Sequence, residues 1–411
     1  MERRVVVTGM GALTPIGNNV ETFWKNAKEG KVGIDNITLI DTENLDVKIA
    51  AEVKDFKPEE FMDKKEVRRL DRFEQFALAT AKMAIEDSKI DLDKVNKKRF
   101  GVYIGSGVGG LQTITDDTSK IALSPSKRVS PFFIPMTIIN LGAGDVAIKY
   151  GLKGPCLAMV TACATGNNSI GEAFRLIKHG YADYMLAGST EAPITRMGVG
   201  GFSSMKALSH SEDFYRASIP FDKERNGFVI GEGGAVLVLE TLESALERGA
   251  KIYAEIVGYG NTCDAHHITA PDPEAEGAVD AMMAAIEEAN INPNEVSYIN
   301  AHGTSTSLND KCETVAIKKL FGDYAYKLPI SSTKSMIGHL LGGAGSAEAV
   351  ISIKALEEGF IPPTVGLEIP DEELDLDYVP KVGRKQELNY VLSNSLGFGG
   401  HNAAILFKKW K

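Results

Sequence analysis

Short apolar runs alternate with helix-like stretches along almost the whole chain, which predicts a layered α/β protein. Runs such as RRVVVTGMG, FGVYIGSG and GGAVLVLET are rich in β-branched residues, whereas FEQFALATAKMAIEDS and GAVDAMMAAIEEAN have the apolar spacing of helices. Several runs are apolar throughout, as expected for strands that are covered by helices on both faces. We therefore expect sheets that lie as central layers between helices.

Two pairs of similar segments indicate an internal duplication. AIEDSKID at 84–91 is similar to AIEEANIN at 285–292, and each precedes a short strand with a glycine turn, VYIGSG or YINAHG. A second pair is AFRLIKHGY at 173–181 and SIKALEEGF at 352–360, both with Gly just after a helix end. The order and the offsets agree between the pairs. We expect two related halves, 1–250 and 251–411.

The composition excludes several classes of protein. With 45 Lys and Arg against 55 Asp and Glu, the net charge is −10, which disfavours binding along a nucleic-acid backbone. Apolar stretches stay shorter than the ~18 residues that indicate a membrane-spanning helix, so we expect no membrane partner. The four cysteines include no C-x-x-C pair and are too few for a disulfide scaffold. These features favour a reducing, cytoplasmic location.

One glycine motif matches the dinucleotide-binding pattern, but its sequence context does not fit that function. Gly105, Gly107 and Gly110 match G-x-G-x-x-G after a predicted strand. A dinucleotide site also needs a second strand with an acidic residue at its end, and LQTITDDTSKIALSPSKRVSP contains no such strand. We therefore predict that these glycines allow close backbone packing beside a site or an interface.

Cys163 is the best candidate for a nucleophile. The apolar run LAMVTA predicts a strand that leads into it, and SIGEAFRLIKHG predicts a helix directly after it. The N-terminus of a helix stabilises a thiolate and can also stabilise an oxyanion. The small neighbours Ala162, Ala164 and Gly166 leave room for a substrate. The alternative is a buried structural cysteine, which is common.

Two histidines have contexts that suit the same chemistry. His302 lies in YINAHGTSTSLND at a predicted strand end, and His339 follows Lys334 by five residues in STKSMIGHLLGGAGSAE. Together with Cys163 they supply a nucleophile and two N–H donors, the set needed to attack a thioester and stabilise an enolate. Taken alone, a histidine in such a context is more often structural. Metal binding is not expected, since no cysteine lies at ligand spacing.

Phe398 stands between Gly397 and Gly399 in SNSLGFGGHNAAILF, just before the last predicted strand. A bulky ring in a glycine turn can act as a gate, because the glycines absorb changes of φ and ψ. The same residues also fit an ordinary hairpin turn. The sequence alone leaves both readings open.

Four motifs together resemble those of the elongating 3-oxoacyl-(acyl carrier protein) synthases of dissociated fatty acid synthesis, most closely the type II enzymes. They are TACATG, NAHGTST, KSMIGH and NSLGFGGHN, and the resemblance spans essentially the whole chain. It implies a thiolase-like fold, with two βαβαβαββ halves in a five-layer α-β-α-β-α core, and a homodimer. It also implies condensation of an acyl chain with malonyl-acyl carrier protein, with substrates on phosphopantetheine and no required cofactor.

The resemblance also implies roles for individual residues. Cys163 would carry the acyl chain, with its own N–H and that of Phe398 as the oxyanion hole, and His302 and His339 would promote decarboxylation. Lys334 would tune the site through His302 and a neighbouring acid, Glu348. Thr304 and Thr306 would hold the phosphopantetheine arm, and Val108, Phe133, Phe202 and Phe398 would form the acyl pocket and gate, Phe133 reaching across the dimer. Some relatives bind a structural monovalent cation at the positions of Asn300, Ala301, Glu348, Ser393 and Asn394.

A basic stretch suggests where a carrier protein docks. If DKKEVRRLDRF is helical, its spacing puts Lys65, Arg68, Arg69 and Arg72 on one face. A solvated helix face is the plainer reading. The resemblance favours docking of the acidic acyl carrier protein at these residues, with Lys206 as a further contact.

Other functions of the same fold stay open at this stage. A polyketide-type ketosynthase would carry similar motifs, and a noncatalytic lipid-binding module would share the fold but tolerate loss of Cys163. Degradative thiolases carry a second cysteine near the C-terminus, where this chain has GFGG. Val108 is smaller than the aliphatic residue common at that position in the family, so the preferred chain length is not predicted.

Overall fold

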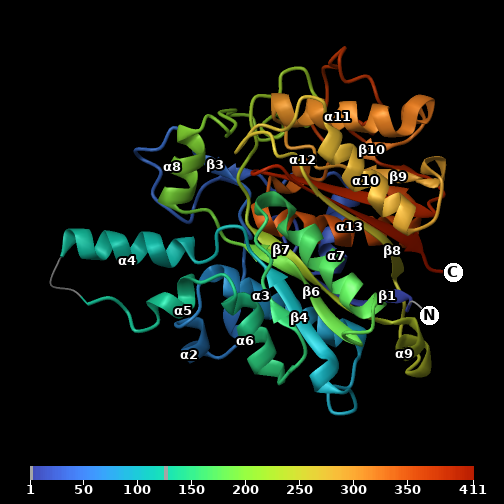
Figure 1. Ribbon diagram of the computed structural model, residues 1–411. Helices are drawn as coiled ribbons and strands as arrows, with labels where there is room; N and C mark the ends of the chain where they lie inside the picture. The colour runs from blue at the N-terminus through green and yellow to red at the C-terminus, as the bar shows by residue number, and fades with distance from the viewer. Residues whose placement is uncertain (1–2, 125–127) are drawn as a thin grey trace.

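A computed structural model describes residues 3–124 and 128–411 (Figure 1). Its main sheet has the strand order β10-β9-β13-β14-β8-β1-β7-β6-β4-β5. The strands from the first half of the chain are β1 (Val5–Leu13), β4 (Phe100–Gly105), β5 (Cys156–Leu157), β6 (Tyr184–Glu191) and β7 (Gly233–Thr241). Those from the second half are β8 (Ala254–Cys263), β9 (Tyr298–Asn300), β10 (Ile330–Ser331), β13 (Tyr390–Gly397) and β14 (His401–Lys409).

The two sets of strands have the same topology. In chain order each set is arranged 3-2-4-5-1, with parallel pairing around its second strand and antiparallel pairing of its fourth strand with its fifth and of its fifth with its first. The sets meet where β1 pairs with β8 in an antiparallel register from Val5↔Ile256 to Val7↔Ala254. The expected duplication is therefore confirmed.

Helices cover both faces of each set of strands. The helices of the first half are α1 (Val20–Lys28), α2 (Lys64–Val67), α3 (Arg72–Ser88), α4 (Leu111–Leu123), α5 (Phe133–Thr137), α6 (Leu141–Tyr150), α7 (Thr165–Lys178), α8 (Arg196–Ser204) and α9 (Leu242–Glu247). Those of the second half are α10 (Glu276–Glu288), α11 (Ser307–Phe321), α12 (Lys334–Ile337) and α13 (Ala344–Glu358). Small two-stranded sheets are formed by β2 (Asp35–Asn36) with β3 (Ile49–Ala50) and by β11 (Phe360–Ile361) with β12 (Arg384–Lys385).

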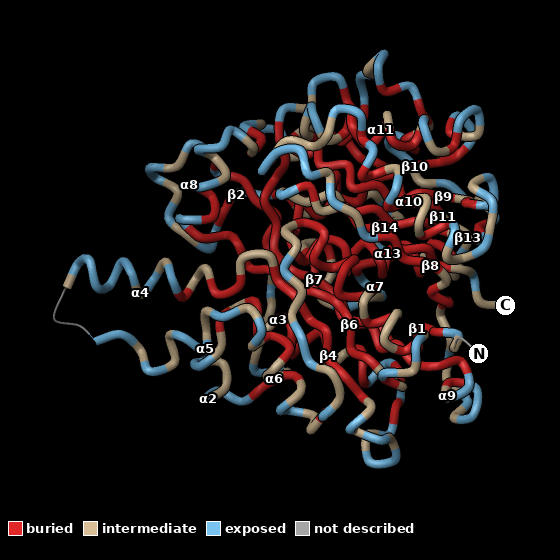
Figure 2. The backbone as a smooth tube through the Cα atoms, viewed as in Figure 1, coloured by how far each residue is buried: buried red, intermediate tan, exposed pale blue. Residues whose placement is uncertain are grey.

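The layers follow from which helix packs on which strands. α3 and α6 cover the outer face of the first set, α10 and α11 lie outside the second, and α7 and α13 pack between the two sets (Figure 1). The sequence AGSAEAV opens α13, and small residues of this kind let strands approach a helix from two sides. The buried backbone of Figure 2 runs through these central strands and α13. The expected five-layer, thiolase-like architecture is confirmed.

The repeated segments lie at equivalent places in the two halves. AIEDSKID and AIEEANIN include the ends of α3 and α10, the outer helices, and the other pair includes the ends of α7 and α13, the central helices. β4 and β9, which follow α3 and α10, are the second strands of their sets. The sequence echo therefore marks structural equivalence and not merely two similar helix ends.

The expected basic helix is broken. α2 ends at Val67, and α3 begins only at Arg72, because Asp71 caps it: the Asp71 side chain accepts from the Phe73 N–H and Glu74 reaches back to the Asp71 N–H. A capping box of this kind starts a helix. The prediction of one helical face that joins Lys65 to Arg72 is therefore wrong.

Among the residues that the structure describes, no helix is both long enough and apolar enough to cross a bilayer.

Candidate active site

Cys163 lies in a tight turn at the N-terminus of the central helix α7. The predicted strand before it is mostly absent, since β5 ends at Leu157 and the chain then turns through the 3-10 segment Ala162–Ala164. Ala162 has a φ of +49°, in the left-handed region that non-glycine residues rarely adopt. This turn places a buried thiol at the start of α7, as expected, although the approach is a loop and not a strand.

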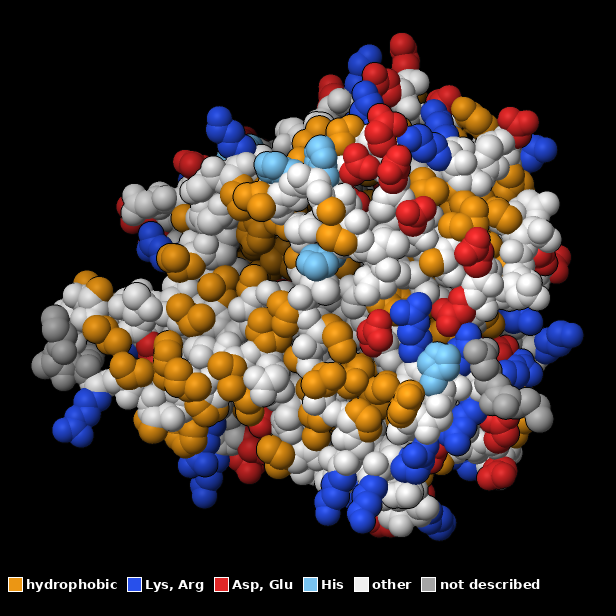
Figure 3. Space-filling model, in the orientation of Figure 1, with side chains coloured by type: hydrophobic (Ala, Val, Ile, Leu, Met, Phe, Trp, Pro, Cys, Tyr) orange, Lys and Arg blue, Asp and Glu red, His pale blue; other side chains and the backbone are white. Residues whose placement is uncertain are grey.

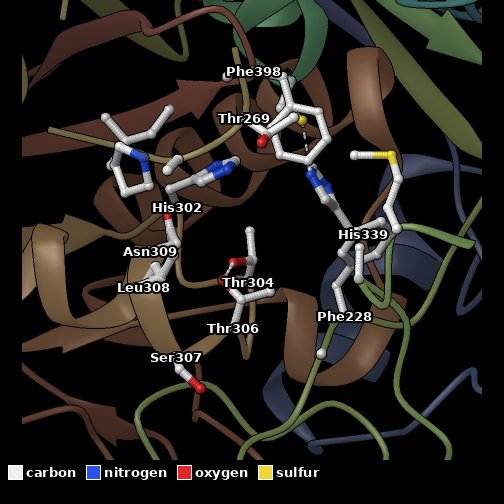
Figure 4. A pocket seen from close by; sticks show the side chains of 18 of the residues that line it. Phe228, Thr269, His302, Thr304, Thr306, Ser307, Leu308, Asn309, His339 and Phe398 are labelled. Atoms are coloured by element: carbon white, nitrogen blue, oxygen red, sulfur yellow. Dashed lines mark hydrogen bonds between the residues drawn. The ribbon is translucent and has the colours of Figure 1, made fainter. Parts of the chain in front are cut away.

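The two candidate histidines come from the other half and converge on this thiol. His302 follows β9, and His339 follows α12. Nε2 of His339 lies 3.0 Å from Sγ of Cys163, and the two imidazole rings are 5.3 Å apart at their centroids. One ligand atom from each of the three residues lies within 4.8 Å of the others. Figure 4 shows both histidines facing the cavity beside Phe398.

Burial keeps the resting site uncharged at these three residues. It lowers the pKa of His302 and of His339 well below the usual value, and the charge of Lys334 adds to that effect. It also raises the pKa of Cys163 to about 12, against the opposing effects of Lys334 and of the Phe398 N–H. Burial of the thiol therefore opposes the stabilisation of a thiolate that the helix end offers. The thiol must lose its proton when it reacts, and His339 is within reach of it.

A buried ion pair supplies the positive charge. Lys334 is hydrogen-bonded to Glu348 of α13, and both side chains are almost completely buried. Burial raises the pKa of Glu348 to about 7, an effect that Lys334 opposes. The predicted partnership of these two residues is confirmed as a contact.

Two acids on α11, which are not among the predicted site residues, shape the loop around His302. Glu313 accepts hydrogen bonds from the N–H groups of His302 and Gly303, both at 2.8 Å. Asp310 accepts from the N–H of Thr304 at 3.0 Å. A signal was present, because D-x-x-E on a helix directly after NAHGTST places both carboxylates one turn apart on the face toward that loop.

Phe398 occupies the turn of the β13–β14 hairpin. Gly399 and Gly400 have φ values of +86° and +76°, which glycine adopts without strain. The Phe398 N–H favours the charged form of Cys163 and so lowers the pKa of the thiol, and the Gly399 N–H donates to the Ile268 carbonyl at 2.8 Å. The hairpin turn is thus present, and its N–H lies where an oxyanion hole is expected. Motion of the ring as a gate stays a prediction.

A cavity of about 330 Å³ leads from the surface to Cys163. Phe398 and Phe202 line it, as do Thr304 and Thr306, whose hydroxyls lie 2.9 Å apart. Lys206 lies at the same cavity (Figure 4 shows its interior). The remaining predicted acyl-pocket residues do not line it. Val108 belongs to the turn after β4, and Phe133 begins α5 on the arm that projects from the body of the molecule (Figure 1).

The five predicted cation ligands are all buried: four lie on or next to the paired strands β9 and β13, with Ser393 opposite Asn300, and Glu348 lies on α13, which packs on β13. Four buried oxygens there have no hydrogen-bond partner among the described residues: Asn300 Oδ1, Ser393 Oγ, Asn394 Oδ1 and Glu348 Oε2. Ala301 contributes backbone next to Asn300. Unpartnered oxygens of this kind fit a monovalent cation, which takes oxygen ligands.

The basic residues divide into two groups. Lys65, Arg68 and Arg69 are exposed, and the Arg69 guanidinium lies 4.7 Å from the centroid of the Phe132 ring. Arg72 instead forms an ion pair with the buried Glu232 at 2.6 Å. Arg72 therefore holds the fold together and does not belong to an exposed docking face.

Comparisons with known proteins place this geometry in context. The family model described as "Beta-ketoacyl synthase, N-terminal domain" matches residues 2–245, and "Beta-ketoacyl synthase, C-terminal domain" matches residues 253–368. A 3-oxoacyl-[acyl-carrier-protein] synthase 2 of Staphylococcus aureus (strain COL) is 53% identical over 409 residues, covering 100% of this chain and 99% of the relative. The Synechocystis protein of the same name is 51% identical over 411 residues, with the same coverage of both chains.

A solved ketosynthase structure has the same fold as this chain. It is described as a type II PKS acyl-carrier protein in complex with its ketosynthase bound to the hexaketide. The matching chain superposes with a TM-score of 0.92 and 33% sequence identity, covering 100% of both chains. The similarity thus extends over the whole molecule and not over one half.

Proposed function

The chain belongs to the beta-ketoacyl synthase family, and on this basis we propose that it is a 3-oxoacyl-(acyl carrier protein) synthase of fatty acid elongation. It condenses an acyl chain carried on Cys163 with malonyl-acyl carrier protein, giving 3-oxoacyl-acyl carrier protein, CO2 and free carrier protein. One observation carries the proposal: a buried thiol from one half meets two buried imidazoles from the other half in a single cavity. A noncatalytic lipid-binding module would not need this convergence.

The first half-reaction transfers the acyl group to the enzyme. Sγ of Cys163 attacks the thioester carbonyl, and its proton passes to Nε2 of His339 at 3.0 Å and then to the departing pantetheine thiolate. The oxyanion that forms lies next to the N–H groups of Cys163 and Phe398, both of which already interact with the sulfur. A new thioester forms and the carrier protein leaves as a free thiol.

The second half-reaction makes the carbon–carbon bond. The malonyl thioester loses CO2, and N–H groups of His302 and His339 stabilise the enolate oxygen. The enolate carbon then attacks the acyl thioester, and the released Cys163 thiolate takes up one proton. Nδ1 of each histidine has no hydrogen-bond partner among the described residues, so the protein fixes neither tautomer. Because loss of CO2 generates the carbanion, the reaction needs no redox cofactor.

Mass spectrometry tests this function directly. The protein is incubated with acyl-acyl carrier proteins of several chain lengths, and adducts are mapped by peptide. We expect an acyl adduct on Cys163 and none in Cys163→Ser, with condensation lost in that folded variant. An adduct that persists in Cys163→Ser would overturn the assignment. Acceptance of long polyketide intermediates in place of saturated acyl chains would favour the polyketide-type ketosynthase.

The carrier protein is the partner that the charges favour. Lys65, Arg68, Arg69 and Lys206 are exposed and open to an acidic partner, and Lys206 lines the cavity that a pantetheine arm would enter toward Thr304. The solved structure of a similar ketosynthase with its acyl-carrier protein supports this partner. Charge reversal at Lys65 and Arg68 tests the docking surface.

A second copy of the chain fits the apolar side of the molecule. Exposed apolar side chains gather on the projecting arm, which carries α4 and α5, as the hydrophobic colouring of Figure 3 shows. Those of the arm are Ile114, Ile121, Leu123, Val129, Ile134 and Ile138. Two more, Leu157 and Val160, lie in or just after the edge strand β5. An edge strand exposes unpaired N–H and C=O groups that a copy of itself can bind. A homodimer would cover this surface and bring Phe133 toward the partner's acyl pocket. Sedimentation equilibrium tests it, and Leu157→Asp should shift the protein toward monomer.

Two further features complete the proposal. A structural monovalent cation would be held by the buried oxygens around Asn300 and Glu348, and metal analysis of protein purified in K⁺ and in choline buffers tests it.

The enzyme would work in a reducing cytoplasm, which suits its free cysteines, including the reactive Cys163. Fractionation of the source cells tests the location.

A further inference from the structure

One carboxylate outside the predicted catalytic set joins the two halves of the molecule beside the nucleophile. Glu191 is the last residue of β6, and its side chain is fully buried. Its Oε1 accepts hydrogen bonds from Ser106 Oγ at 2.5 Å and from the Val108 N–H at 3.1 Å. Its Oε2 accepts from the Gly107 N–H at 2.6 Å and from the Gly342 N–H at 2.9 Å. Four donors thus share one side chain.

These donors belong to two turns that reach the site from opposite halves. Residues 106–108 follow β4, and Gly342 lies in the 3-10 turn Leu341–Gly343, which follows His339 and leads into α13. A Cβ on Gly107 would lie 2.6 Å from Glu191 Oε2 and 3.6 Å from the Ala162 carbonyl oxygen, and a Cβ on Gly342 would overlap both Glu191 and the Gly107 nitrogen. The two turns therefore touch each other and the turn that carries Cys163.

We propose that Glu191 is a positioning residue for the condensation, an inference that rests on the proposed function. Its carboxylate holds the turn at Val108, which follows β4, and the turn at Gly342, which follows His339, in one frame around Cys163. Errors of about 1 Å in the placement of reacting groups cost on the order of 10²-fold in rate, so a shared anchor for both turns is a catalytic requirement and not only a packing feature.

The hydrogen bonds fit an ionised carboxylate. Ser106 Oγ accepts from the Gly109 N–H, which directs its own proton to Glu191, and the other three partners are N–H donors. Burial raises the pKa of Glu191, and these hydrogen bonds oppose that effect. The negative charge also acts on the nucleophile, since it raises the pKa of Cys163. Glu191 therefore influences both the geometry and the reactivity of the thiol.

Glu240 provides a matched control within the same pair of strands. It is also a fully buried glutamate, but it pairs across from Tyr184 at the other end of β6, whereas Glu191 pairs with Gly233. Its carboxylate binds the Arg248 guanidinium at 2.6 Å and accepts from Thr8 Oγ1 at 2.5 Å, far along the strands from Cys163. A merely structural role of buried glutamates in this sheet would make the two residues behave alike.

The test replaces Glu191 by Gln in the full chain. The amide keeps the size of the side chain, but its N–H groups face two N–H donors at the Oε2 position or one N–H donor at the Oε1 position, so part of the anchor is lost. We expect kcat for condensation to fall on the order of 10-fold to 100-fold, with the apparent KM for carrier-protein substrates unchanged. Glu191→Asp keeps the charge and the acceptors and should recover part of kcat. Glu240→Gln should lower the melting temperature with kcat retained.

A second measurement follows the thiol itself. Removal of a nearby negative charge stabilises the thiolate, so the pH profile of Cys163 alkylation by iodoacetamide should move to lower pH in Glu191→Gln and stay in place in Glu191→Asp and Glu240→Gln. Lys334, His302 and His339 also face the sulfur and are unchanged in all three variants. Folded Glu191→Gln with the parent kcat, or with an unmoved profile, would overturn the proposal.

Two further experiments distinguish a failure of this proposal from a folding defect and from a failure of the proposed function. Ser106→Ala removes one of the four hydrogen bonds, so it should lower kcat a few-fold even if Glu191→Gln fails to fold, and the parent kcat in Ser106→Ala would then count against the proposal. If the unmodified protein fails to condense acyl-carrier and malonyl-carrier protein, the proposed function falls. In that case the alkylation profile still decides whether Glu191 acts on Cys163.

Discussion

Removing the ammonium group of Lys334 should be the most costly single change in the site. The ion pair with Glu348 is buried, with 1% and 0% of the two side chains exposed. Loss of one partner of such a pair leaves an uncompensated charge and costs about 3–5 kcal/mol of the free energy of unfolding. We therefore expect Lys334→Met to lose about that amount.

The pH dependence of this loss has a defined sign. Burial raises the pKa of Glu348 to about 7, and Lys334 opposes the rise, so the pKa goes higher still in Lys334→Met. A native carboxyl whose pKa exceeds its unfolded value binds a proton that the unfolded chain has released, so its contribution to stability falls as pH rises. Lys334→Met should therefore be less destabilised at pH 6 than at pH 8.

Urea unfolding of four proteins measures the effect. They are the parent, Lys334→Met, Glu348→Gln and the double variant, each at pH 6 and pH 8. The double variant buries no charge at this pair, so it should be more stable than the sum of the single losses predicts, with a coupling of about 2 kcal/mol or more. A single-variant loss below about 1 kcal/mol at pH 8, or additive losses in the double variant, would refute the reasoning.

Three further outcomes can be measured on the same protein. Alkylation of Cys163 should speed up roughly tenfold per pH unit from pH 7 to pH 10, because burial raises the pKa of the thiol to about 12; a plateau near neutral pH would instead show a resting thiolate. Phe398→Ala should change the order and selectivity of acyl loading in stopped-flow assays without unfolding the protein, and parent kinetics would return the ring to an ordinary turn. Charge reversal at Lys65 and Arg68 should raise the apparent KM for carrier-protein substrates several-fold and flatten its salt dependence, while short pantetheine thioesters react as before; equal losses with both substrates would place the docking surface elsewhere.

The sequence was most informative where local pattern and chemistry coincide. The layered fold, its duplication and the convergence of Cys163 with His302 and His339 all follow from motifs that a strand end or helix start can carry. The repeated segments were reliable because they sit at equivalent helix ends of both halves. Local motifs of this kind predict the site correctly because the fold brings strand ends and helix starts together there.

The failures have physical causes that involve distant partners or competing local signals. The basic stretch looked like one helix until the capping box at Asp71 interrupted it, and Arg72 then found Glu232 across the structure. Burial raises the pKa of Cys163, against the effect of the helix end, and no residue beside it in the sequence reveals that burial. Glu191 could not be identified, since its four donors lie in segments about 84 and 151 residues away.

The pairing of β1 with β8 brings the two ends of the chain to the same place. Ala254, the first residue of β8, has Val7 of β1 on one side and Lys409 of β14 on the other, and both termini lie at that side of the molecule in Figure 1. Along the polypeptide the first half precedes the second, but the two halves occupy equivalent places on either side of the β1–β8 pairing. A circularly permuted chain that starts at β8, runs through β14, and continues by a short linker into β1 would bury the same seam. The active site depends on how the two halves pack at the β1–β8 pairing and not on their order along the chain.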